Sequence, residues 1–289
     1  MRILLHKILR KNKFIPGKIR RKISEITFNR IERSIRGKSI DKDLGRINYI
    51  IEPNRKLNES NVIFASSDFK YLKRFLKPLA ESYNRSGVNG IMHIHLVGDG
   101  RCISEYTDFS KKIADENNID LCLSFDDVNF SNMDKFDIER YCQCIRFIRM
   151  PELIMRYNSV ILCIDIDTII LKDPFIENDR LSKMGDVGIA INEAERDIGR
   201  KMLAGCVWVK NTNKSIKYFN DASNIMKRHL FYAFYTEKLD QRALYMAYNN
   251  NTDTVFNLPR GYMSKNIKEK PYMYAMQGPL KNIINKSSE

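Results

Sequence analysis

The chain has 289 residues, of which 43% are apolar and 29% charged, and it carries a formal net charge of +14. This length and apolar fraction are enough to bury a large core, which excludes a disordered chain, a collagen and a small disulfide scaffold. A membrane-spanning helix needs ~18–20 consecutive apolar residues, and the most apolar segment, residues 160–171, is interrupted by two aspartates.

The positive charge is concentrated at the start of the chain. Residues 1–40 carry thirteen Lys or Arg and two acidic residues, whereas the remainder is nearly balanced. Apolar residues at helical spacing predict amphipathic helices over residues 2–13 and 18–36, the second with a stripe of Ile19, Ile23 and Ile26. Basic side chains beside such a stripe are typical of a helix in an anionic membrane interface.

We therefore predict an anionic membrane surface as the partner of residues 1–40. A solvated helical cap, a transit peptide and a nucleic-acid-binding arm are the alternatives. No nucleic acid is expected as a partner, because the rest of the chain has no basic groove interleaved with aromatic residues. Cysteine spacing fits no zinc site, and several thiols lie in apolar runs, which favours a reducing compartment. We expect a cytoplasmic location, peripheral on the inner face of a membrane where the arm binds one.

From about residue 61 onward, strands and helices alternate. Strands are predicted at 62–65, 91–97, 120–125, 160–164, 187–191, 206–209 and 254–258. Helices are predicted at 69–83, 103–116, 137–157 with a bend at Pro151, and 239–248. This alternation predicts an α/β fold with a mostly parallel sheet and helices on both faces. We divide the chain into a basic amphipathic helical arm, residues 1–60, and a single domain, residues 61–289.

Two aspartates follow the apolar strand at 160–164 directly. Open α/β sheets bind ligands beyond the carboxyl ends of their strands, and residues two apart on an extended chain point to the same side. Asp165 and Asp167 can therefore face one ion. Mn²⁺ and Mg²⁺ prefer oxygen ligands and bridge carboxylates to substrate phosphates. We predict that these aspartates bind Mn²⁺ or Mg²⁺; the alternative is a solvated strand end that begins a turn.

Further segments follow the order of motifs in one enzyme family. These segments are 62–68 with Tyr71, 141–153 with Arg146, 160–168 with 173–174, 203–209 with Asn211, 240–244 and 278–281. Together they resemble the GT-A-fold nucleotide-sugar glycosyltransferases, in particular glycosyltransferase family 8, which includes glycogenin and galactosyltransferases. The resemblance covers residues 61 to about 282 and implies a GT-A fold for the domain.

The resemblance also implies a role for each matching position. Asp165 and Asp167 would hold the metal on the donor's diphosphate. The residues that would bind the donor are Ala65, Ser66, Asp68, Tyr71, Arg146, Ala204, Gly205 and Lys281. Cleavage of a sugar–diphosphate bond builds negative charge on the leaving group, which Arg146 and Lys281 would neutralise together with the metal. Asp240 and Gln241 would be the catalytic residues that face the reacting sugar carbon or the acceptor hydroxyl.

Two positions depart from the family pattern. Leu203 replaces an asparagine that contacts the donor sugar in the family, so the identity of the sugar stays open. Ala275 stands where the family usually has a histidine that completes the metal site. Asp165 and Asp167 would then share the metal with phosphates and water alone. His93 and His95 lie on one strand face, and we predict a packed pair of histidines there rather than a second metal site.

We expect a metal-dependent glycosyltransferase. It would transfer a sugar from a nucleotide-sugar donor, with UDP as the expected nucleotide, to a glycan or lipid-linked acceptor in the synthesis of cell-envelope polysaccharide or lipopolysaccharide. The alternatives are a non-catalytic membrane-surface protein on a degenerate GT-A fold, a nucleotidyltransferase, and a phosphotransferase of the haloacid dehalogenase type. Sugar, acceptor, linkage, stereochemistry and oligomeric state lie beyond what one sequence specifies.

Overall fold

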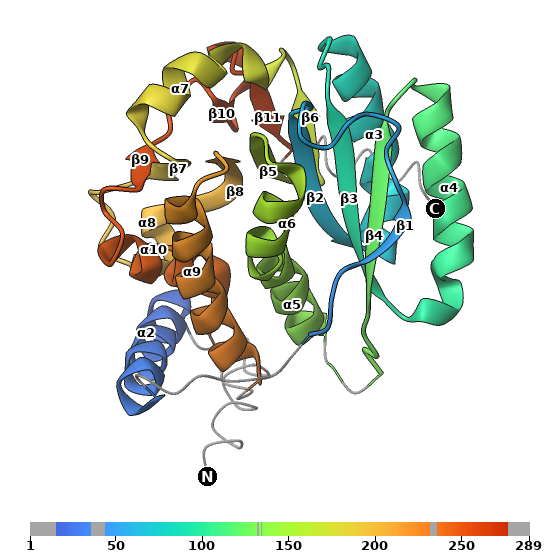
Figure 1. Ribbon diagram of the computed structural model, residues 1–289. Coiled ribbons are helices and arrows are strands. Elements are labelled where there is room, and N and C mark those ends of the chain that lie inside the picture. Colours follow the sequence, from blue (N-terminus) through green and yellow to red (C-terminus); the bar gives the residue numbers. More distant parts are fainter. Residues whose placement is uncertain (1–15, 36–43, 132, 134, 232–235, 277–289) are drawn as a thin grey trace.

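A computed structural model describes residues 16–35, 44–131, 133, 135–231 and 236–276. An eight-stranded sheet forms its centre, in the order β1-β4-β3-β2-β5-β8-β7-β9 (Figure 1). The strands are β1 Asn48–Ile51, β2 Val62–Asp68, β3 Ile91–Gly98, β4 Leu121–Asp127, β5 Ile161–Asp165, β7 Val187–Ile191, β8 Met202–Val209 and β9 Val255–Asn257. The parallel pairs are β2 with β3, β2 with β5, β3 with β4, and β7 with β9. Strand β1 is antiparallel to β4, and β8 is antiparallel to both β5 and β7. The predicted mostly parallel sheet is confirmed.

Helices cover both faces of this sheet. The helices on one face are α3 Phe69–Arg85, α4 Ile103–Glu116 and α7 Asn178–Met184. Those on the other face are α5 Lys135–Ile148, α6 Met150–Tyr157, α9 Asn213–Phe231 and α10 Leu239–Asn249. Alternate residues of β5 separate the two cores: Ile161 and Cys163 pack toward α5, and Leu162 and Ile164 pack toward α3. A continuously apolar strand such as β5 is therefore buried on both sides, as expected for the centre of an α/β sheet.

The predicted long helix at 137–157 is two helices. Helix α5 ends at Ile148, and Pro151 lies in the first turn of α6. A proline is tolerated there because its missing N–H is one that a first helical turn leaves unbonded in any case. The bend predicted at Pro151 is thereby confirmed, with the break falling just before the proline.

A second, smaller sheet extends the edge of the molecule beyond the two aspartates. Its strands are β10 Met263–Ser264, β11 Met273–Ala275 and β6 Thr168–Ile170, in that order. Short 3₁₀ helices lie at Gly100–Cys102, Pro174–Glu177 and Ile267–Glu269. The antiparallel pairing of β6 with β11 sets Thr168 opposite Ala275 and brings the chain near residue 276 back to the aspartates.

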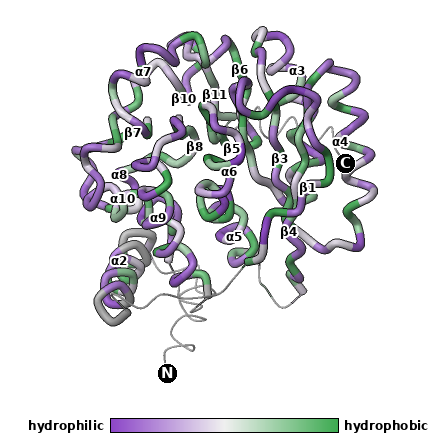
Figure 2. The backbone as a smooth tube through the Cα atoms, in the orientation of Figure 1, coloured by the Kyte–Doolittle hydropathy of each residue, from purple (hydrophilic) through white to green (hydrophobic). Residues whose placement is uncertain are grey.

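The segment before residue 61 contributes both a helix and a strand to the described structure. Helix α2, Gly17–Ile35, confirms the second of the two predicted helices and packs on α9. Strand β1 pairs with β4, so part of the segment 1–60 belongs to the central sheet. The predicted helix at residues 2–13 lies outside the described residues. In Figure 2 hydrophilic and hydrophobic residues are mixed along the helices, and no described helix combines the length and apolar character needed to cross a membrane.

Both histidines of β3 are core residues. His93 Nε2 and His95 Nδ1 contact Ser124 Oγ at 2.7 and 2.8 Å, and the Tyr157 hydroxyl lies 2.8 Å from His93 Nδ1. His95 Nε2 lies 3.2 Å from a carboxylate oxygen of Asp126. The prediction of a packed pair is confirmed. All six cysteines are free.

Candidate active site

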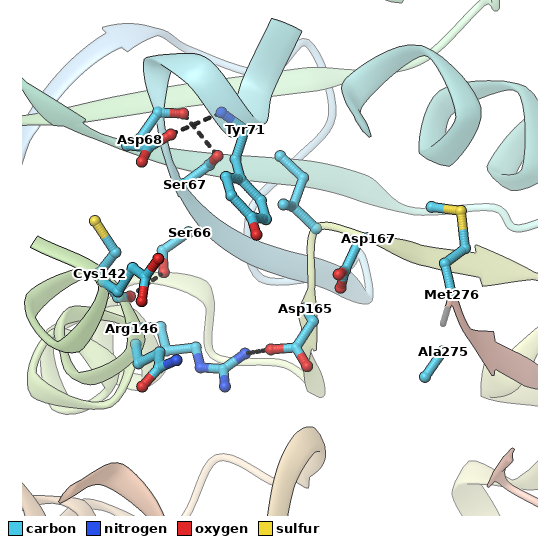
Figure 3. Close-up of a pocket in the computed structure, with 13 residues that line it drawn as sticks. Ser66, Ser67, Asp68, Tyr71, Cys142, Arg146, Asp165, Asp167, Ala275 and Met276 are labelled. Carbon is cyan, nitrogen blue, oxygen red and sulfur yellow. Dashed lines mark hydrogen bonds and ion pairs between the residues drawn. The ribbon is translucent and has the colours of Figure 1, made fainter. Parts of the chain in front are cut away.

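A cavity of about 610 Å³ opens at the carboxyl ends of β2 and β5 (Figure 3). Six of the predicted site residues line it: Ser66, Asp68, Tyr71, Arg146, Asp165 and Asp167. They come from three separate parts of the chain, namely the end of β2 with the start of α3, the last turn of α5, and the end of β5 with the turn that follows it. The parallel register of β2 and β5 pairs Ser66 with Asp165, which is why both strands deliver their last residues to one place.

Hydrogen bonds fix the wall of the cavity at the end of β2. The Asp68 carboxylate caps helix α3 by accepting a hydrogen bond of 2.7 Å from the backbone N–H of Tyr71. Ser66 Oγ donates to the carbonyl oxygen of Cys142 at 3.1 Å and so ties β2 to α5. The Tyr71 ring projects into the cavity opposite Arg146 in Figure 3 and packs beside Phe75. The cap holds this ring in place, because Asp68 fixes the first turn of α3.

The two aspartates at the end of β5 face the same cavity, one from the last position of the strand and one from the turn that follows it. Asp165 is the last residue of β5, and Asp167 immediately precedes β6. The backbone N–H of Met276 donates to the carbonyl oxygen of Asp167 at 3.1 Å, so the second sheet anchors this turn. A Cβ atom on Gly205 would lie 2.9 Å from Asp165 Oδ2. The absence of a side chain at Gly205 therefore leaves the room that the Asp165 carboxylate occupies.

Arg146 lies between two carboxylates. Its Nη1 donates to Asp165 Oδ1, and its Nη2 lies 3.6 Å from Asp240 Oδ2. Burial raises the pKa of Asp240, and Arg146 offsets only part of that rise. In the described structure, Asp240 Oδ1 and Arg146 Nε are buried and have no hydrogen-bond partner. Groups of this kind are costly to bury, so they are candidates for contact with a ligand.

Besides Asp240, the first turn of α10 carries Gln241 and Arg242, and their side chains bind the segment just before β8. In the amide orientation that satisfies both partners, the side-chain nitrogen of Gln241 donates hydrogen bonds to the carbonyl oxygens of Gly199 and Met202, at 2.6 and 3.1 Å. Arg242 Nη2 donates to Asp197 Oδ1 at 2.9 Å. Helix α8, Ile198–Lys201, and the start of β8 are therefore fixed by the residues that follow Asp240.

The remaining predicted residues differ in their placement. Ala65 is buried within β2 and Ala204 within β8, and neither lines the cavity. Gly205 does not line it either, but lies next to the Asp165 carboxylate. Gln241 is turned toward the α8 backbone. Lys281 lies outside the described residues. Asp240 lies behind the cavity wall, next to Arg146.

Sequence reasoning missed several lining residues. They are Ser67, Glu139, Cys142, Gln143, Ile166 and Met276. The spacing of Glu139, Gln143 and Arg146 places them on one face of a helix, and this pattern could have identified the first two. Met276 had no comparable signal, because it reaches the cavity only through the pairing of β11 with β6. Ala275 also lines the cavity, at the position that the family resemblance assigns to the metal site.

The residues present fit a hard divalent cation that shares its ligands with a substrate. In the described part of the chain, no three His, Cys, Asp or Glu side chains form a metal-binding group. Asp165 and Asp167 supply oxygen ligands alone, which is the donor type of Mg²⁺ and Mn²⁺, and such ions commonly take one or two carboxylates together with phosphates and water. The cavity is also lined by Asp68 and Glu139, with Arg146 as its one described basic residue. A diphosphate needs an added cation in such surroundings.

Comparison with known proteins identifies the fold. No family model matches the chain, and no curated protein matches it in sequence. Among solved structures, the chain is similar to the bifunctional glycosyltransferase WbbM in its apo form, with a TM-score of 0.52, 15% identity, and coverage of 82% of this chain and 50% of WbbM. The fold is that of the GT-A glycosyltransferases.

Two further similar structures have lower scores. Mouse xyloside xylosyltransferase 1 has a TM-score of 0.48 and 10% identity, with coverage of 75% of this chain and 98% of that one. Galactosyltransferase LgtC, in complex with donor and acceptor sugar analogues, has a TM-score of 0.49 and 12% identity, with coverage of 79% and 95%. The expected GT-A fold is confirmed, whereas membership of glycosyltransferase family 8 stays a prediction.

Proposed function

We propose that the protein is a glycosyltransferase that takes its sugar from a nucleotide-sugar donor, with UDP as the nucleotide. One observation carries this proposal: Asp68, Tyr71, Arg146, Asp165 and Asp167 line one cavity of about 610 Å³ at the carboxyl ends of β2 and β5. The cavity is large enough for a nucleotide sugar. It also lies where open α/β sheets bind ligands.

The lining residues suggest how the donor lies. The Tyr71 ring and the Asp68 carboxylate form one end of the cavity and would bind the nucleoside, the ring by stacking and the carboxylate by accepting hydrogen bonds. The diphosphate would then lie between Arg146 and the two aspartates. A bound Mn²⁺ or Mg²⁺ would neutralise phosphate charge there, and Asp165 and Asp167 would hold that ion. Gly205, next to Asp165, would lie beside the sugar.

The chemistry follows from this placement. In transfer, the bond between the anomeric carbon and the diphosphate breaks, the acceptor hydroxyl oxygen forms the new bond to that carbon, and the hydroxyl proton passes to the leaving diphosphate. Negative charge develops on the leaving diphosphate, and Arg146 is placed to stabilise it at low dielectric. We propose Asp240, which lies behind the cavity wall, as the carboxylate that holds Arg146 in this position. Gln241, through its bonds to α8, would position the start of β8 with Ala204 and Gly205.

The proposed acceptor is a glycan or a lipid-linked glycan, as in the synthesis of cell-envelope polysaccharide. The proposed second partner is an anionic membrane surface, bound through the basic segment 1–40. Its thirteen basic residues support this partner, because each Lys or Arg near an anionic surface adds to binding. Lys281 stays a proposed phosphate ligand.

Calorimetric titration of the full chain with UDP, GDP, ADP and CMP, each with and without Mn²⁺, tests the donor site. We expect selective binding of UDP that Mn²⁺ strengthens. The Asp165→Ala/Asp167→Ala variant should lose this binding. Asp253→Ala, which removes an exposed carboxylate bound to Lys214, should keep it. Failure of all four nucleotides to bind would contradict the proposal and favour a non-catalytic protein on this fold.

A further inference from the structure

Helix α2 turns two of the three isoleucines of its apolar stripe away from the protein, and the third, Ile23, is half-buried. Ile19 and Ile26 are 50% and 58% exposed, although they belong to the stripe that helical spacing predicts. Lys22 and Arg30 are exposed on the same face. Residues 19, 22, 26 and 30 recur at intervals of three and four, so they form one continuous outward face.

The opposite face of α2 is packed against α9 and the segment that leads into α10. Ser24 and Phe28 are fully buried. The Phe28 ring stacks on His229 with a centroid distance of 4.4 Å. Glu32 accepts hydrogen bonds from Arg228 at 2.6 Å and from His229 Nε2 at 3.0 Å. The helix therefore docks on the protein by a small polar and aromatic face rather than by its apolar stripe.

The acidic residues of α2 are both directed toward the protein. Glu32 forms the ion pair with Arg228, and Glu25 lies close enough to Arg242 to stabilise its charge. Burial would raise the pKa of Glu32, but hydrogen bonds from His229 and Arg228 lower it below its ordinary value. Among the described side chains, the outward face thus combines isoleucine with Lys and Arg.

The inward face of α2 also contacts the segment that carries Asp240. Ser24 Oγ accepts a hydrogen bond of 2.9 Å from the backbone N–H of Glu237, and the Arg242 guanidinium lies 5.9 Å from the centre of the Phe28 ring. These contacts lie on both sides of Asp240 in the chain. Loss of these two contacts would loosen the first turn of α10, the turn that places Asp240 beside Arg146.

We propose that α2 lies on an anionic lipid surface with its outward face, while its inward face holds residues 236–242 and so fixes Asp240. Exposed isoleucines flanked by basic residues match the acyl–headgroup boundary, where apolar side chains enter the bilayer and Lys or Arg reach the phosphates. A flat helix of this kind needs no membrane span. The significance of Asp240 rests on the proposed glycosyltransferase activity; the lipid contact does not.

The charge part of the test uses the full chain and vesicles of phosphatidylcholine with about one third phosphatidylglycerol. We expect binding to these vesicles, weakened by salt, and none to pure phosphatidylcholine. The Lys22→Ser/Arg30→Ser variant should bind about twentyfold to thirtyfold more weakly, because each basic residue near such a surface contributes about fivefold. The matched control, Lys77→Ser/Lys112→Ser, removes exposed lysines of α3 and α4 and should bind like the wild type.

The apolar part of the test removes the stripe. The Ile19→Ser/Ile26→Ser variant should lose at least about tenfold in vesicle affinity. Ile176→Ser/Ile267→Ser is the matched control, because these isoleucines are also exposed but lie outside α2. The proposal is overturned if the wild type binds both vesicle types alike or neither, or if both outward-face variants bind as the wild type does.

Hydrogen exchange tests the inward face without reference to lipid or activity. Ser24→Ala removes the acceptor of the Glu237 amide, so the amides of residues 236–242 should exchange about fivefold faster. The outward-face variants should leave this exchange, and nucleotide binding, unchanged. Unaltered exchange in Ser24→Ala would refute the link to Asp240. If vesicle binding behaves as expected but no nucleotide binds, the proposed function fails and the lipid contact stands.

Discussion

The carboxyl ends of β4 and β5 both combine acidic residues with an arginine, but the arginine is bonded differently at the two ends. Strand β4 ends with Asp126 and Asp127, and β5 ends with Asp165, which Asp167 follows two residues later. An arginine pairs with one of the acidic residues at each end. Arg149 binds Asp126 through two hydrogen bonds of 2.9 and 2.6 Å. It also donates to two backbone carbonyl oxygens of the segment before β1. This arginine is fully occupied within the protein.

Arg146, one helical turn earlier, is less completely bonded. It binds one oxygen of Asp165, whose side chain is 43% exposed, whereas the side chain of Asp126 is 7% exposed. Its Nε and Asp240 Oδ1 have no partner in the described structure. An arginine that is saturated stabilises the fold, and one that keeps bonding capacity beside a cavity can bind a ligand. Acidic residues at the end of a strand therefore indicate a ligand-binding site only when the arginine that pairs with them keeps unused hydrogen-bond donors.

The largest effect is expected when the ion pair of Arg149 with Asp126 is broken. Arg149→Met leaves Asp126 buried without its main counter-charge, and we expect the free energy of unfolding to fall by about 3–5 kcal/mol. Urea denaturation measures this loss. Arg146→Met should instead abolish nucleotide binding with a smaller loss of stability. A reversal of the two outcomes would show that the roles of the arginines have been assigned the wrong way round.

The second prediction uses pH, because the network behind Asp126 contains His93. Burial lowers the pKa of His93 well below 6.5, and the neighbouring His95 and Arg156 lower it further. The unfolded chain takes up a proton here near pH 6.5 and the folded chain does not, so this contribution to stability is complete above that pH and is lost below it. We expect a fall of up to about 1.4 kcal/mol per pH unit in acid. His93→Gln should flatten the profile measured by urea denaturation at several pH values.

The third prediction concerns the room beside Asp165. A Cβ atom at Gly205 would meet Asp165 Oδ2 at 2.9 Å, so Gly205→Ala should displace the carboxylate and weaken Mn²⁺-dependent UDP binding about tenfold. Gly188→Ala is the contrasting variant, because its Cβ would meet Phe256 at 2.6 Å, far from the aspartates. It should lower stability and leave binding intact. Equal binding by wild type and Gly205→Ala in calorimetry would remove Gly205 from the site.

Much of the sheet and half of the cavity could be predicted from local pattern. The apolar strand at 160–164 followed by Asp165 and Asp167 predicts both a buried central strand and polar residues at its carboxyl end. The capping position of Asp68 and the helical face of Arg146 are also local features. Parallel pairing then brings these residues together, because neighbouring strands end at the same edge of the sheet.

What could not be predicted depends on contacts between distant segments. Met276 reaches the cavity because β11, which it follows, pairs with β6, more than one hundred residues earlier in the chain. The orientation of α2 is a second case: periodicity identifies the stripe of Ile19 and Ile26, but the docking face is decided by Phe28 and by the ion pair of Glu32. Helical spacing finds the faces of a helix without specifying which one is buried.

The smallest effect is expected from substitution of Asp127, which we compare with Asp167. Each is the second aspartate of its pair along the chain. Asp127 Oδ1 accepts a hydrogen bond of 3.0 Å from the backbone N–H of Gly100, so Asp127 fixes the loop after β3. Asp127→Asn keeps an acceptor at this position and should lower the free energy of unfolding by less than about 1 kcal/mol. It should not change UDP affinity, whereas Asp167→Asn should weaken the Mn²⁺-dependent part of that affinity. Parallel titrations of the two variants measure the difference. If Asp127→Asn weakened UDP binding as much as Asp167→Asn, the donor site would extend to β4 and the contrast between the two strand ends would fail.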